Sequence, residues 1–133
     1  MSITTRSQEY LKLAEKLVGE VEPKDGGMKK IYGGLCHKFP VLVLTCGLCQ
    51  AVAFSCDKAT GESDRAKAHG LLLEHVAKVL GSSREQLTEH IRTAPLEEYM
   101  LDTRRVLDAW SYFKRFAVSI LKVENAREAE DGE

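Results

Sequence analysis

The sequence feature that most limits the fold is an uncharged run from Val41 to Cys56. Its 16 residues are apolar nearly all round, so their spacing does not separate helix from strand, and 41–45 alone would fit a buried strand. The run is longer than an average strand, and no second strand-like run is present to pair with it. It is shorter than the roughly 18 apolar residues of a membrane-spanning helix. We therefore expect a buried, uncharged central helix over 41–56, with Pro40 in its first turn.

Most other apolar residues recur at the spacing of an amphipathic helix. The predicted helices are 7–21, a shorter one over 28–38, 64–80, a short one that carries Leu87 and Ile91, and 95–123. Within 28–38, the Gly33-Gly34 pair weakens the helix prediction. The expected start signals are two capping boxes, Thr5–Gln8 and Ser83–Gln86, and Ser63 as a capping residue. The sequence thus predicts an all-α fold, a single compact bundle of five to six helices.

Charge is divided unevenly along the chain. The 133 residues carry 19 basic and 20 acidic side chains, a net charge of −1. The segment 124–133 holds five of the acids and one base, which leaves a body of 18 bases and 15 acids, or +3. We expect one helical domain over 1–123 and an acidic, disordered tail over 124–133. The 44% apolar and 29% charged composition excludes a disordered or fibrous chain.

Sequence signatures of catalysis are missing. The chain has no phosphate-binding loop, nucleophile elbow, His-Glu-x-x-His or dinucleotide fingerprint, so we expect no enzyme activity and no cofactor. His75 lies on an apolar helix face, which favours a hydrogen-bonded core histidine over a general base.

The four cysteines favour a structural interpretation over a metal site. Cys46 and Cys49 form one Cys-x-x-Cys, whereas a zinc ribbon has two, and on one helix Cys46 and Cys56 would lie about 15 Å apart. We expect small buried hydrophobic residues and no metal, with a metal or redox pair as alternatives. Four cysteines and no secretory signal predict reduced thiols in the cytoplasm.

Basic residues form the candidate binding site. On the last predicted helix, Arg104, Arg115 and Lys122 are spaced by 11 and 7 residues and would lie within about 40° of one another. Arg105 and Lys114 flank that stripe, and a second set lies near the glycine-rich loop: Lys29, Lys30 and Lys38. Such side chains contact RNA or DNA phosphates without reading sequence. Because acidic residues intersperse the cluster, a solvated helix face is the alternative.

Several ordered motifs resemble one known family. They are Tyr32-Gly33, the stretch Lys38-Phe39-Pro40-Val41-Leu42-Val43, the stretch Gly47-Leu48-Cys49-Gln50-Ala51-Val52-Ala53-Phe54, and Tyr112-Phe113-Lys114-Arg115-Phe116-Ala117. Together they resemble the small subunit of the Cmr-type (type III-B) CRISPR effector complex over most of positions 9–122. The cysteines at 36, 46, 49 and 56 depart from the family pattern.

The resemblance implies a non-catalytic helical bundle that acts in antiviral defence. Copies would stack into the minor filament of a ribonucleoprotein, bind other subunits of the complex, and contact the guide RNA and target RNA. Lys38 and Arg115 lie inside matching motifs, whereas the other basic candidates depend on helix geometry. The alternatives are a homo-oligomeric helical adaptor without RNA binding and, last, a thiol- or metal-dependent enzyme that uses Cys46 and Cys49.

Overall fold

Six helices and no strand make up residues 4–24 and 26–127, the part of the chain that the computed structural model describes. The helices are α1 (Arg6–Val21), α2 (Gly26–Cys46), α3 (Leu48–Lys58), α4 (Asp64–Val79), α5 (Arg84–Thr93) and α6 (Leu96–Ser119). The predicted all-α bundle is confirmed. No helix in these ranges has the length and apolar character needed to span a membrane.

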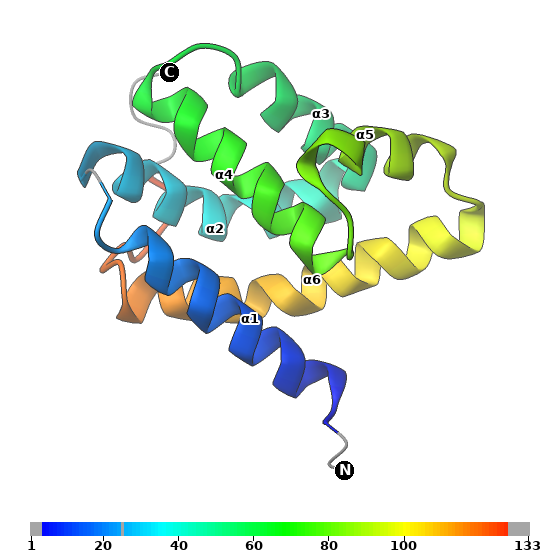
Figure 1. The fold of residues 1–133 in the computed structure, drawn as a ribbon, viewed down its shortest axis with the longest axis horizontal. Coiled ribbons are helices and arrows are strands. Elements are labelled where there is room, and N and C mark those ends of the chain that lie inside the picture. Colours follow the sequence, from blue (N-terminus) through cyan, green and yellow to red (C-terminus); the bar gives the residue numbers. More distant parts are fainter. Residues whose placement is uncertain (1–3, 25, 128–133) are drawn as a thin grey trace.

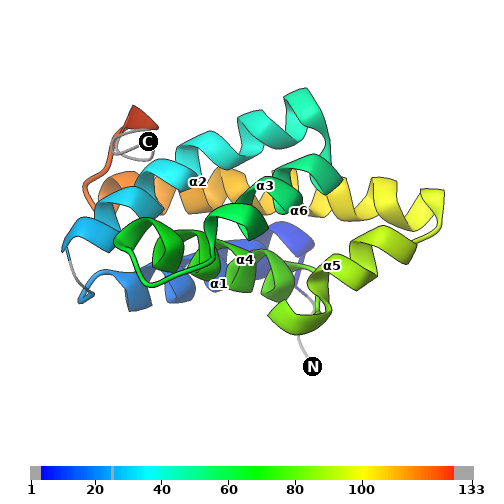
Figure 2. The same cartoon turned by 90° about the horizontal axis from the view of Figure 1, so that it is seen from above.

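Helix α2 lies at the centre, between α4 and α6 (Figure 1). Helix α1 packs along α6, and α3 turns back against α2 and α4 (Figure 2). The core between α2 and α6 is aromatic: Trp110 stacks on Phe113 with ring centroids 4.2 Å apart, and Phe39 lies 5.3 Å from Trp110. All three side chains are buried, so the apolar face of α6 packs into the core.

All three predicted helix starts are confirmed, and two of them form the predicted capping hydrogen bonds. The Thr5 hydroxyl accepts from the Gln8 N–H at 3.1 Å, and the Thr5 N–H donates to the Gln8 side chain at 2.7 Å. Ser63 accepts from the Ala66 N–H at 3.1 Å. The predicted capping box at Ser83 is wrong, because its side chain makes no cap hydrogen bond and the Gln86 N–H donates to the Ser83 carbonyl instead.

The uncharged run is helical, but the prediction of one helix over 41–56 is wrong. Helix α2 begins at Gly26, runs through Pro40 and ends at Cys46, and α3 starts after Gly47. Gly47 has a φ of 91°, a backbone conformation that residues with a side chain rarely adopt. This conformation ends α2 and divides the uncharged run into two helices. The run is also only partly buried, since Val41 and Leu44 are 58% and 73% exposed.

The last helix ends earlier than the predicted Val123. After Ser119 the chain turns at Lys122, which has a φ of 63°, and the Val123 N–H donates to the Ala117 carbonyl at 3.0 Å. This hydrogen bond gives a partner to one of the carbonyls that the end of the helix leaves unpaired. Residues 120–125 then lie against α2, and we call them the C-terminal strap. The predicted tail over 124–133 falls mainly on 128–133, outside the described residues.

Candidate nucleic-acid and subunit interface

An open groove of about 580 Å³ runs between α2 and α6. Its lining comes from one face of each helix: His37, Pro40, Val41 and Leu44 of α2, and Leu107, Ser111, Lys114, Arg115 and Val118 of α6. Residues three and four apart share a helix face, which is why these two sets line one groove. The sequence does not predict the groove, because its apolar pattern assigns Val41 and Leu44 to the core.

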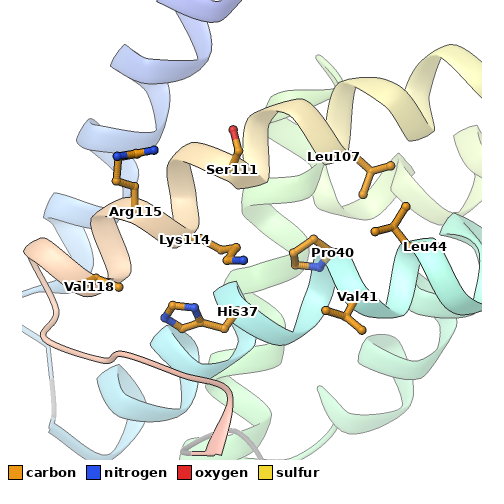
Figure 3. Close-up of a pocket in the computed structure, with 9 residues that line it drawn as sticks. All are labelled: His37, Pro40, Val41, Leu44, Leu107, Ser111, Lys114, Arg115 and Val118. Carbon is orange, nitrogen blue, oxygen red and sulfur yellow. The ribbon is translucent and has the colours of Figure 1, made fainter.

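The two ends of the groove differ in chemistry. Leu44, Leu107 and Val41 gather at one end, and Lys114, Arg115 and His37 lie toward the other (Figure 3). Both basic side chains are exposed, and among residues 4–24 and 26–127 neither forms an ion pair. One end therefore suits an apolar protein surface, and the other end suits an anion.

The remaining basic candidates of α6 are held in ion pairs. Exposed Arg104 lies 3.9 Å from Asp108, a surface pair that contributes little to stability. Arg105 is half-buried between Asp102 at 3.5 Å and Glu98 at 3.8 Å. Because Asp102 is buried, Arg105 compensates a buried carboxylate, and its guanidinium is less available to a partner than that of Arg104.

Lys38 lies away from the groove, on the side of α2 that faces α3. Its ammonium is 5.7 Å from the centroid of the Phe54 ring, and that of Lys58 is 5.5 Å from the same centroid. These cation–π contacts hold the side chains of both lysines against the Phe54 ring. Lys58 is not among the predicted site residues. Its position in the last turn of α3 is the sequence feature that could have identified it as a candidate.

Lys29, Lys30 and Lys122 form a third basic surface. They line a cavity of about 480 Å³ between the first turns of α2 and the C-terminal strap. We call this cavity the strap cavity. The predicted helical position of Lys122 is wrong, because α6 ends at Ser119. The predicted stripe on the last helix is therefore divided among the groove, the ion pairs of α6 and the strap cavity, and the second predicted set is divided between the strap cavity and the Phe54 ring.

The thiols and His75 lie outside these surfaces. Burial raises the pKa of Cys36 to about 12, as expected of a core thiol, whereas Cys46 and Cys49 are exposed at the Gly47 break, contrary to prediction. The Tyr32 hydroxyl and Nδ1 of His75 are hydrogen-bonded at 2.5 Å, and burial lowers the pKa of His75 to about 3. The prediction of a hydrogen-bonded core histidine is confirmed.

One group in the described ranges has metal-ligand chemistry: His90, Glu98 and Asp102. Nε2 of His90 lies 2.8 Å from Asp102, and Arg105 pairs with both carboxylates. A cation would have to displace the guanidinium, so these residues fit an ion-pair network better than a metal site. None of the cysteines belongs to this group.

The fold and its surfaces define a small helical bundle with an open groove suited to another macromolecule. The chain belongs to the CRISPR-associated Cas_Cmr5 family, whose model matches residues 6–120. It is 37% identical over 119 residues to the CRISPR system Cmr subunit Cmr5 of Thermus thermophilus, covering 89% of this chain and 97% of that protein.

The structural comparison agrees with this assignment. The crystal structure of a CRISPR-associated Cmr5 family protein from Thermus thermophilus matches with a TM-score of 0.76 and 37% identity. The match covers 88% of this chain and 98% of that one. The family resemblance inferred from the sequence motifs is therefore confirmed.

Proposed function

We propose that this chain is a non-catalytic structural subunit of a cytoplasmic type III-B (Cmr) CRISPR ribonucleoprotein that acts in antiviral defence. Its copies stack into the minor filament and contact the guide and target RNA backbone through basic side chains. Family membership and the name of the Thermus relative, a subunit of a CRISPR Cmr system, support the complex. The main support for the proposed RNA and subunit contacts is the groove between α2 and α6, which has an apolar end and a basic end.

The basic end of the groove is the proposed RNA contact. Lys114 and Arg115 are exposed neighbours on α6, and both lie in the stretch 112–117 that resembles a motif of the family. Ammonium and guanidinium groups bind phosphate oxygens whatever the base sequence, as a subunit that supports many different guides requires. A body of only +3 suits a protein that touches RNA as one of several subunits.

The apolar end is the proposed contact with the neighbouring copy. Exposed apolar residues continue from the groove along the same face of α6, since Met100 and Leu96 precede Leu107 by 7 and 11 residues. Met100 is 62% exposed and Leu96 is 73% exposed. With Val41 and Leu44 they give an apolar strip of the kind that marks a protein–protein interface.

RNA binding is tested with a fluorescent single-stranded RNA titrated at several salt concentrations. Reversing charge in the double variant Lys114→Glu and Arg115→Glu should weaken binding and reduce the slope of log K against log salt by about 1.4, two phosphate contacts. Lys12→Glu with Lys16→Glu is the matched control, because these exposed lysines lie on α1. Full affinity and an unchanged slope in the groove variant would contradict the RNA contact.

Stacking is tested separately by sedimentation velocity. Leu44→Asp places a charge in the apolar end and should lower self-association, whereas the Lys114 and Arg115 double variant should leave it largely intact. Salt-insensitive self-association with no RNA retention would favour the alternative, a homo-oligomeric adaptor. Co-purification of a small guide RNA and several larger proteins with the tagged chain tests membership of the complex directly.

A further inference from the structure

The C-terminal strap is fixed to the bundle at Val123. The Val123 N–H donates to the Ala117 carbonyl at 3.0 Å, and Nε2–H of His37 donates to the Val123 carbonyl at 2.8 Å. The side chain of Val123 is only 4% exposed and lies directly over Gly33. A Cβ added at Gly33 would stand 2.6 Å from Cγ2 of Val123, so only glycine leaves room for the strap.

This attachment determines where Lys122 lies. The residue has a φ of 63°, the left-handed region that residues with side chains seldom adopt. Such a conformation persists where the surroundings impose it, and the hydrogen bonds and packing at the next residue, Val123, do so here. As a result Lys122 lines the strap cavity together with Lys29 and Lys30.

The strap cavity has the chemistry of an anion site. Its volume is about 480 Å³, and it is lined by three lysines, one glutamate (Glu124), the amide of Asn125 and two apolar residues. Lys29 is held in place, because its ammonium donates to the Glu22 carbonyl at 3.2 Å. Three positive charges against one negative charge disfavour a cation and leave an apolar ligand poorly matched.

We propose that the strap cavity binds a backbone phosphate of the RNA strand that passes the basic end of the groove. This inference rests on the proposed function. His37 links the two places, because it lines the groove and also holds Val123 of the strap. Lys29, Lys30 and Lys122 contact the phosphate, whereas Gly33, His37 and Val123 are positioning residues that act through Lys122.

Direct contact is tested in the full chain with single-residue variants and the same RNA titration. Lys122→Ala should weaken RNA binding about tenfold, the value of one charge-assisted hydrogen bond, and reduce the salt slope by about 0.7. Glu124→Gln should strengthen binding, because it removes the negative charge from the cavity. Lys78→Ala, an exposed lysine on α4, is the control that should leave binding unchanged.

Positioning is tested by changing size without changing charge. Gly33→Ala should displace Val123 and weaken RNA binding to the extent that Lys122→Ala does. The Cβ of Val123 is itself 2.7 Å from the added Cβ, so space is restored only by the double variant Gly33→Ala with Val123→Gly, which keeps the backbone hydrogen bonds of residue 123 and should recover most of the affinity. A salt slope that Gly33→Ala lowers as Lys122→Ala does, and that the double variant restores, separates positioning of Lys122 from a merely structural role. Gly19→Ala is the matched control, since a Cβ there meets nothing within 4 Å. Circular dichroism establishes that each variant is folded.

The outcomes separate this inference from the proposed function. RNA binding that depends on Lys114 and Arg115 but not on Lys122 or Gly33 would overturn the phosphate site alone. Absence of RNA binding by both the chain and the purified complex would overturn the proposed function. Inorganic phosphate that protects the cavity from lysine acylation, while RNA does not, would assign the site to a free anion and also overturn the inference.

Discussion

His75 makes the stability of the bundle sensitive to acid. Its side chain is 3% exposed, and burial, with smaller contributions from Lys78 and Lys24, lowers its pKa from 6.5 to about 3. The unfolded chain therefore binds a proton between pH 6.5 and 3 that the folded chain excludes. The contribution that neutral His75 makes to the free energy of unfolding is complete above pH 6.5 and is lost as the pH falls toward 3. From pH 7 to pH 5 the loss from His75 amounts to about 2 kcal/mol.

The variant His75→Asn isolates this effect. Its amide oxygen can stand near the position of imidazole Nδ1 and accept the Tyr32 hydroxyl, but the side chain does not titrate. Urea unfolding followed by circular dichroism at pH 7 and pH 5 gives the free energy of unfolding for each protein. We expect the variant to be less stable at pH 7 because asparagine is smaller, and to lose about 2 kcal/mol less than the wild type on acidification.

Tyr32→Phe is the control for the hydrogen bond. It keeps His75 buried and removes only its partner, so the loss of stability between pH 7 and pH 5 should persist. Equal acid-induced losses in the wild type and in His75→Asn would refute the reasoning, because the proton would then bind elsewhere.

Three further results are expected. Trp110→Ala should lower the free energy of unfolding by about 3–5 kcal/mol in the same urea assay, since the ring is fully buried; a loss below about 1 kcal/mol would contradict the aromatic core. Lys122→Gly should leave the protein as stable or up to about 1 kcal/mol more stable, because glycine accepts a φ of 63°, yet it should weaken RNA binding. With a thiol reagent at pH 8, exposed Cys46 and Cys49 should react in the folded protein, whereas Cys36, whose pKa is about 12, should react only after unfolding.

The helices with local start signals could be predicted closely from the sequence. Thr5 and Ser63 determine where α1 and α4 begin, because a capping hydrogen bond joins residues only three positions apart. The sequence misplaces a helix start at Pro40 because a proline inside a helix removes one backbone hydrogen bond. Burial of the neighbouring Phe39 and Val43, 1% and 3% exposed, offsets that cost. Local sequence carries no information on such packing.

The candidate site could be predicted only in part. The aromatic-Lys-Arg motif identifies Lys114 and Arg115, but it does not reveal the groove beside them, because Val41 and Leu44 are as apolar as core residues. The position of Lys122 depends on Val123 packing over Gly33, 90 residues earlier in the chain. Contacts between positions that far apart have no periodic signature in a single sequence.

The pairing of α1 with α6 has a consequence for biosynthesis. The buried face of α1, with Ala14, Leu17 and Val18, packs mainly on a helix that the ribosome completes only at residue 119. During translation α1 is made long before α6, so its apolar face lacks its main partner until α6 has been synthesised. A chain truncated before α6 would leave this face of α1 without its main partner, and exposed apolar surface of that kind promotes aggregation.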